Sequence, residues 1–253
     1  MSRIGICALA VGLASLAAPA WAQYTPLFVI PTQNAAGVTL PAGKAARVRI
    51  TSVDAAMLAR SLGVEVPADA ASFEYLIDAY PQLQSRAERS WLEATFMVDF
   101  DQSAFAKLKD EMKGQGVRAE RAALVAFVDE LIDENFARGW DIASVIAERR
   151  QGDCSEHAVL TAALARAVGL PARVVVGVAL ISQGSEHAAF GHAWTEMLEG
   201  GKWVVADAAL YGTDQAVRYV PLGLIEDEGF GYRMGLATLT RRWIQSVDVL
   251  EPR

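Results

Sequence analysis

The chain has 253 residues, 53% of them hydrophobic and 21% charged, and its formal net charge at pH 7 is −7. This apolar content suits a packed core, and the length suits one large domain or two small ones. Because the net charge is negative and the charges are scattered, we expect neither nucleic acid nor an anionic membrane surface as a partner.

The first 22 residues have the layout of a secretory signal peptide. Arg3 is the only charged residue there, an apolar run follows it, and Ala20-Trp21-Ala22 supplies the small-residue pattern of a cleavage site. A membrane anchor is the alternative, but the apolar run is too short to cross a bilayer and a cleavage pattern follows it. The sequence therefore predicts cleavage after Ala22, a periplasmic or secreted protein, and no membrane span after cleavage.

Cleavage would leave Cys154 as the only cysteine, since Cys7 lies within the signal peptide. In an oxidising compartment cysteines usually pair, so a single one is either buried and inert or kept for its reactivity. A third role, redox sensing, would need a resolving cysteine, which the rest of the chain lacks. Composition alone does not choose between the first two roles.

Residues 23–117 are expected to form an N-terminal region of mixed strand and helix, whose role the sequence does not reveal. Pro, Gly and polar residues are frequent in 23–44, and Gly-Gln-Gly at 114–116 interrupts the chain near the end of the region. The expected elements are strands over 46–54 and 90–101, short helices within 55–90 that break near Pro67 and Pro81, and a helix over 102–112.

Residues 118–253 are expected to form a second domain, in which helices come first and an antiparallel sheet follows. Apolar residues at helical spacing predict the helices, and the β-branched run at 172–181 is typical of a buried strand. This order of elements indicates an α+β fold. The expected elements are helices over 119–137, over 141–150 with Asp141 as its cap, and from Cys154 onward, then strands over 172–181, 190–198 and 202–210.

The helix that begins at Cys154 has a strong start signal. Asp153 is a good N-cap, and Glu156, three residues later, completes a capping box. Gly152 allows a tight turn before the cap, and small apolar side chains let the helix lie close against a sheet. The helix dipole lowers the pKa of a thiol at this end, which favours the reactive thiolate. The charges of Asp153 and Glu156 oppose this, so we expect a nearby imidazolium to assist.

His192 is the best placed of the three histidines to act on this thiol. A Gly-Gly turn at 200–201 predicts a hairpin in which Trp194 lies opposite Asp207. His192 and Asp207 then share one face of the sheet as diagonal neighbours, ~7–8 Å apart at Cα and within side-chain reach. A shift of one residue would put them on opposite faces. With the expected register, Asp207 can fix the imidazole tautomer and His192 can take the thiol proton.

These residues lie in segments that resemble the bacterial transglutaminase-like superfamily. The segments are GDCSEHAVLTAALARAVGLPARVVVGV (152–178) and GHAWTEMLEGGKWVVADAAL (191–210), within a stretch of similarity over roughly 120–222. In that family three segments, GxC, HAW and WxxxD, supply a catalytic triad within a papain-like core. The resemblance therefore implies an α+β fold with a transglutaminase-like (papain-like) core, in which the nucleophile helix packs on an antiparallel sheet.

Carried over by position, the resemblance implies that Cys154 is the nucleophile, His192 the general base and Asp207 the orienting carboxylate. One departure is the dipeptide Asp207-Ala208, where many relatives have Asp-Pro, and this change should loosen the turn. The Cys154 backbone N–H would be one oxyanion donor, with Gln151 and Trp140 as candidates for the second.

Other residues near the expected site have weaker assignments. His157 either lines the cleft or bonds a neighbouring carbonyl group. Trp194, like Trp203, is expected to pack in the core or to form a wall of the cleft. Glu196 is expected to form an ion pair or hydrogen bond, and His187 to lie exposed in a loop. A zinc site is a further alternative, and its ligands would be Cys154, His157, His192 and Asp207.

The function implied is that of an exported cysteine acyl-transfer enzyme that acts on amide bonds through a thioester intermediate, without metal or cofactor. The substrates would be peptides or proteins, with those of the cell envelope among the candidates. Hydrolysis is preferred to transamidation only because bulk water is the default acceptor. The alternative from another class is a non-catalytic binding or scaffold module of the envelope. The sequence does not reveal the substrate or the oligomeric state.

Overall fold

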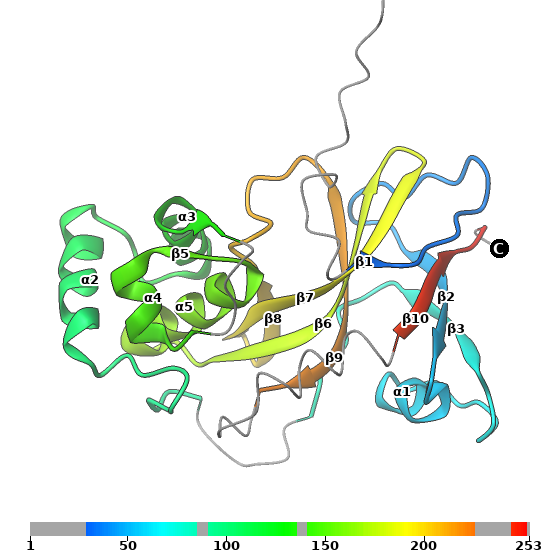
Figure 1. Cartoon of the computed structure of the whole chain (residues 1–253), viewed down its shortest axis with the longest axis horizontal. Coiled ribbons are helices and arrows are strands. Elements are labelled where there is room, and N and C mark those ends of the chain that lie inside the picture. Colours follow the sequence, from blue (N-terminus) through cyan, green and yellow to red (C-terminus); the bar gives the residue numbers. More distant parts are fainter. Residues whose placement is uncertain (1–28, 85–90, 136–140, 226–243, 252–253) are drawn as a thin grey trace, which may run out of the picture.

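The computed structural model describes residues 29–84, 91–135, 141–225 and 244–251. The predicted signal peptide and Trp140 lie outside these residues. A helical group lies at one end of the molecule, a long sheet lies in the middle, and a smaller sheet with one helix lies at the other end (Figure 1). No helix in the described part of the chain combines the length and the apolar character needed to cross a membrane.

The central sheet is antiparallel, and its long middle strands are β6 and β7. Twelve residues of β6 pair with β7 in an unbroken register, and all residues of β6 except the last are buried, as the β-branched run predicts. The strand order is β1-β7-β6-β9, and β8 pairs with the same strand β7 as β1 does. The strands are β1 (Val29–Ile30), β6 (Ala172–Gln183), β7 (Glu186–Glu199), β8 (Lys202–Ala206) and β9 (Ala216–Leu224).

Two different layers cover the same face of this sheet. Near one end of β6, Val174 and Val176 pack in a core that contains the helices. Further along, Val178 and Leu180 pack in a second core with the smaller sheet. Because alternate residues of a strand face the same way, these four side chains share one face. The helices are α2 (Ser103–Gly114), α3 (Arg121–Leu131), α4 (Ala143–Arg149) and α5 (Cys154–Ala167), and the two-residue strands β4 (Asp133–Glu134) and β5 (Gln151–Gly152) pair among them.

The smaller sheet is built by chain segments that are far apart in sequence. Its order is β10-β2-β3, with β10 (Ile244–Val249) antiparallel to β2 (Ala46–Ser52), and β2 antiparallel to β3 (Ser72–Ile77). Helix α1 (Ala55–Ser61) follows β2 and buries Leu58 in the same core as Ile50 and Val247. The last described strand of the chain therefore completes the sheet of the N-terminal region.

The α+β fold and the packing of the cysteine helix on an antiparallel sheet are confirmed. Most of the expected helices and strands are also found. The helix over 141–150 is shorter than expected, and its cap was predicted wrongly: Ile142 is the N-cap residue, and Asp141 instead forms an ion pair with Arg149 (3.2 Å).

Two further expectations for the N-terminal region are wrong. Residues 91–101 contain no strand, because Thr95 and Val98 form a local turn and the adjacent side chains of Met97 and Val98 are both buried. A strand would send adjacent side chains to opposite faces. Within 55–84, where only helices were expected, β3 alternates buried Phe73 and Ile77 with exposed residues, and this period of two suits its pairing with β2.

We predict that Gly177→Ala destabilises the protein by ~1–3 kcal/mol, the usual cost of overpacking. A Cβ at Gly177 would lie 2.2 Å from the Val220 carbonyl oxygen and 2.7 Å from Cη2 of Trp194, so β9 or the indole would have to move. Urea unfolding would measure the change. The control is Gly114→Ala at the end of α2, where a Cβ meets no atom within 4 Å, and an equal loss in both variants would contradict the prediction.

Candidate active site

Cys154 is the first residue of α5, as predicted, and the capping box is present. The Asp153 carboxylate accepts a hydrogen bond from the Ser155 backbone N–H (2.8 Å), and the Glu156 carboxylate accepts one from the Asp153 N–H (3.0 Å). Cys154 itself is partly buried against the helical core. The local sequence therefore fixes the position of the sulfur at the start of the helix.

The start of α5 meets β7 at an edge that the described strands leave open. On this edge β1 pairs with residues 189–190 and β8 with residues 195–199, so no described strand pairs with 191–194. The Cys154 thiol lies within hydrogen-bonding reach of the His192 ring and of the Ala193 backbone N–H. Thr195 also donates a hydrogen bond to the Ala158 carbonyl (2.6 Å), which ties α5 to the same strand.

The predicted hairpin and its register are confirmed. Gly200 (φ +57°) and Gly201 (φ +80°) both adopt the left-handed conformation that a tight two-residue hairpin turn requires. The ladder runs from Glu199 opposite Lys202 to Thr195 opposite Ala206. In this register, His192 Nε2 donates a hydrogen bond to Asp207 Oδ2 at 2.8 Å. Both side chains are buried, with 6% and 5% of their surface exposed.

Asp207 is held by four hydrogen bonds. Its Oδ1 accepts from the backbone N–H groups of Ala209 (3.1 Å) and Leu210 (3.3 Å), so the turn after Asp207 is closed by its own carboxylate. Its Oδ2 accepts from the Tyr219 hydroxyl (2.8 Å) as well as from His192. Sequence reasoning missed Tyr219, because the loop between β8 and β9 gives no signal of which β9 residue meets the hairpin.

The electrostatics of the three groups favour an imidazolium–carboxylate pair. Burial lowers the pKa of His192, but the charges of Asp207 and Cys154 outweigh this effect and raise that pKa to about 10. Burial raises the pKa of Asp207, but the His192 charge and the hydrogen bonds to the carboxylate lower it below its ordinary value. At neutral pH, Asp207 is therefore ionised, and its charge favours the protonated form of His192, which the Cys154 thiolate favours further once it forms.

The thiol pKa moves opposite to the expectation from the helix dipole. Burial raises the pKa of Cys154, the charge of Asp153 adds to the rise, and the His192 imidazolium opposes it without overcoming it. The expected lowering of this pKa was therefore wrong, because the thiol is packed between helix and strand with an acidic N-cap beside it. The resting site at neutral pH therefore holds a neutral thiol, and a positive charge on His192 favours its conversion to the thiolate.

A buried polar network lies directly behind His192. The ring of Trp194, which is fully buried, stacks on the imidazole with centroids 6.1 Å apart, and its Nε1 donates to the Tyr80 hydroxyl (2.9 Å). The same hydroxyl donates to Glu196, which forms a buried ion pair with Arg173 (2.5 Å). Trp194 is thus a core residue in contact with His192, and Glu196 is paired as expected, whereas the sequence did not single out Tyr80.

The other candidate residues, Gln151, His157 and His187, are each bonded to a residue outside the triad. Gln151 is exposed on β5, and its side-chain oxygen accepts a hydrogen bond from Asn135 Nδ2 (3.3 Å). His157 is buried and donates from Nδ1 to the Asp153 carbonyl (2.8 Å), the second of its two expected roles. His187 was predicted wrongly as exposed: β7 begins at Glu186, and buried His187 donates from Nε2 to the Val38 carbonyl (3.0 Å).

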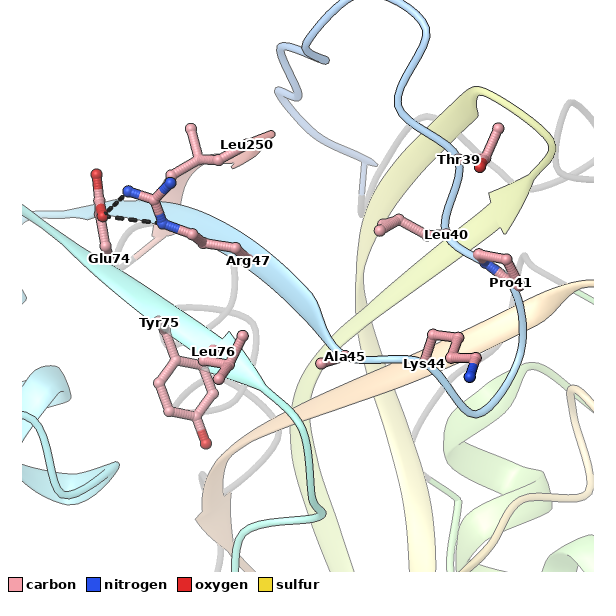
Figure 2. A pocket seen from close by; sticks show the side chains of 10 residues that line it. All are labelled: Thr39, Leu40, Pro41, Lys44, Ala45, Arg47, Glu74, Tyr75, Leu76 and Leu250. Carbon is pink, nitrogen blue, oxygen red and sulfur yellow. Dashed lines mark hydrogen bonds and ion pairs between the residues drawn. The ribbon is translucent and has the colours of Figure 1, made fainter. Parts of the chain in front are cut away.

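Among the described residues, no group of three or more His, Cys, Asp or Glu side chains is arranged to hold a metal ion. A cavity of about 660 Å³ lies in the N-terminal region, between the loop at 39–45 and strands β2 and β3. Figure 2 shows the Arg47–Glu74 ion pair there, with Tyr75 and Leu76 on β3 and Lys44 on the loop. No cysteine or histidine lines this cavity, so it supplies none of the expected chemistry.

We predict that the rate of Cys154 alkylation by iodoacetamide rises with pH, with a midpoint above the ordinary thiol value of about 8.5. Because the His192 charge and hydrogen bond lower the pKa of Cys154, His192→Ala moves the midpoint to higher pH. For each pKa unit of this shift, the alkylation rate at pH 8 falls by about tenfold. The urea-unfolded protein supplies the reference midpoint. An unchanged profile in the variant would show that the imidazole does not act on the thiol.

We also predict that Tyr219→Phe lowers the free energy of unfolding by ~1 kcal/mol, because one buried hydrogen bond to Asp207 is lost. The matched control is Tyr211→Phe, since Tyr211 is 47% exposed. Urea unfolding of both variants measures the difference. Equal stability of the two variants would mean that the Tyr219–Asp207 bond makes no net contribution.

Comparison with known proteins locates the similarity in the same part of the chain. Residues 106–208 match the family model of the Transglutaminase-like superfamily, which confirms the resemblance seen in the sequence. The matched stretch begins within α2, whose Phe105 and Leu108 pack in the same core as α5. The domain limits expected near 117–118 stay a prediction. No curated protein matches the chain.

Two solved structures resemble the chain. One is a proposed cysteine protease from Cytophaga hutchinsonii, with 19% identity and a TM-score of 0.41 over 64% of this chain and 50% of that one. The other is the periplasmic domain of TgpA from Pseudomonas aeruginosa bound to ethylmercury, with 22% identity and a TM-score of 0.38 over 58% of this chain and 59% of that one. The chain thus covers between half and three-fifths of the length of these two solved chains.

Proposed function

We propose, given a central segment that matches the transglutaminase-like superfamily, that this chain is a cysteine acyl-transfer enzyme acting on amide bonds of peptides or proteins. The observation that carries the proposal is the contact of Cys154 with a buried His192 ring whose Nε2 donates to Asp207 at 2.8 Å. In this arrangement the thiol interacts with a group that can carry its proton, and a carboxylate orients that group.

Each member of the proposed triad has one role. Asp207 engages Nε2 of His192, which leaves Nδ1 as the ring nitrogen for the sulfur. The ionised Asp207 fixes the ring orientation and stabilises the imidazolium. When Cys154 passes its proton to Nδ1 of His192, the product is a thiolate beside a positive ring, and attraction between the two stabilises the reactive form. Activity is therefore expected to rise toward alkaline pH.

The proposed reaction proceeds through a thioester. The Cys154 thiolate attacks the amide carbonyl carbon, a C–S bond forms, and negative charge develops on the carbonyl oxygen. The Cys154 backbone N–H, at the start of α5, is one donor for that oxygen, and Gln151 stays a candidate for the second. His192 then donates its proton to the departing nitrogen as the C–N bond breaks.

The second nucleophile decides the enzyme class. Water, giving up a proton to His192, would break the C–S bond and release an acid, which is a protease or amidase reaction. A primary amine would give a new amide, which is transamidation. We favour hydrolysis because water needs no dedicated acceptor site. The signal-peptide pattern predicted at residues 1–22 supports export to the periplasm or beyond, so envelope peptides and proteins are candidate substrates.

The experiment incubates the purified chain with dimethylcasein and dansylcadaverine, with Cys154→Ser as the inactive control. Hydrolysis would give new amino termini or ammonia without dansyl incorporation, and transamidation would give dansyl incorporation with ammonia release. Activity lost in Cys154→Ser supports the acyl-transfer proposal. If neither reaction occurs, and the pH profile of Cys154 alkylation is the same in the wild type and in His192→Ala, the non-catalytic scaffold is the correct interpretation.

A further inference from the structure

Glu156 is a fully buried acidic side chain next to the nucleophile, and the triad does not use it. Its two carboxylate oxygens accept hydrogen bonds from two separate parts of the backbone. Oε2 accepts from the Asp153 N–H (3.0 Å), immediately before Cys154. Oε1 accepts from the Asp141 N–H (2.9 Å), two residues before α4. A single carboxylate therefore joins the start of the cysteine helix to the start of the neighbouring helix.

The backbone around Glu156 is shaped to accommodate this contact. A Cβ at Gly152 would lie 2.2 Å from Cβ of Glu156 and 2.8 Å from its Oε2, so only glycine allows the side chain to fold back over the chain. Ser155 Oγ, on the other side of Cys154, lies 2.7 Å from Asp153 Oδ1 and 3.1 Å from Glu156 Oε2. The residues on both sides of the nucleophile are thus bonded to this carboxyl group.

We propose that Glu156 is a positioning residue for the reaction of Cys154, bonding the Asp153 N–H on one side of the thiol and the Ser155 hydroxyl on the other so that the sulfur stays directed at His192. This inference rests on the proposed acyl-transfer function. Neutral glutamine has nearly the same shape but only one acceptor oxygen, so its amide nitrogen must face one of the two N–H donors. Glu156→Gln therefore breaks one of the two anchors with little change of volume.

Because of the charges around Glu156, its effect on the reaction can be measured separately from its effect on the stability of the fold. It faces Asp153 on the cap of α5 and the Asp141 segment before α4, where Arg149 pairs with the Asp141 carboxylate (3.2 Å). Burial raises the pKa of Glu156 to about 7, and the charge of Asp153 adds to the rise. A carboxyl group with a raised pKa stabilises the fold at low pH, and this contribution is lost as the pH rises through about 7. Above that pH, glutamine removes a buried negative charge.

The test measures acylation of Cys154 by p-nitrophenyl acetate in the full chain, as the rate constant of the p-nitrophenolate burst. Burst amplitude counts the competent sites, so a partly unfolded sample does not distort the rate constant. We expect Glu156→Gln to acylate about tenfold more slowly at pH 8, because displacement of a reacting group by a fraction of an ångström has effects of this order. Its thermal midpoint at pH 8 should equal or exceed that of the wild type, and should depend less on pH between 5 and 8.

Two further variants complete the design. Gly152→Ala keeps the charge but displaces the Glu156 side chain, and should also slow acylation. Glu148→Gln changes an exposed carboxylate on α4 and should acylate at the wild-type rate. A Cys154-dependent burst that is equally fast in wild type and Glu156→Gln would overturn the positioning role and leave the acyl-transfer proposal standing. If neither a burst nor continuing release of p-nitrophenolate depends on Cys154, the acyl-transfer proposal fails and the positioning role fails with it.

Discussion

The unbroken pairing of β6 with β7 is the interaction on which the site depends. A strand sends alternate side chains to opposite faces, so the register of β7 decides which residues meet the hairpin partner and which meet the helix. His192 and Trp194 take one face, and Ala193 and Thr195 take the other, beside α5. Cys154 reaches His192 because β7 is left open by the described strands at 191–194, between the segments that pair with β1 and β8.

The buried ion pair of Arg173 and Glu196 adds little net stability, but it holds the side chains around the hairpin in place. Arg173 and Glu196 have 1% and 0% of their side-chain surface exposed, and desolvation offsets much of the attraction between such ions. Further contacts nevertheless hold the pair in one geometry. The Tyr80 hydroxyl donates to Glu196 and accepts from Trp194 Nε1. The Arg173 guanidinium lies 4.1 Å from the centre of the Trp203 ring. This network holds Trp194, and hence the ring stacked on it, in one position. The N-terminal region therefore contributes, through Tyr80, to the surroundings of His192.

Local signals in the sequence predicted the parts of the site that local structure determines. The capping box placed Cys154, and the Gly-Gly turn placed His192 near Asp207, because both depend on residues close together in the chain. Tyr80 lies 114 residues from Trp194, and no periodicity connects them. His187 was misjudged for the same reason, since the carbonyl that buries it belongs to Val38, 149 residues away. The prediction of a strand at 90–101 was wrong because apolar residues can also anchor a loop.

For the exported enzyme proposed above, the raised pKa of Cys154 bears on how a single cysteine persists in an oxidising compartment. Thiolates are oxidised and exchange with disulfides much faster than neutral thiols do. In the resting site, burial keeps Cys154 neutral, whereas the adjacent imidazolium stabilises the thiolate once it forms. The burial that opposes the charged forms of His192 and Asp207 thus also lowers the resting reactivity of the sulfur. The export and the catalysis proposed above are therefore compatible for Cys154, because a neutral thiol is protected until the thiolate forms.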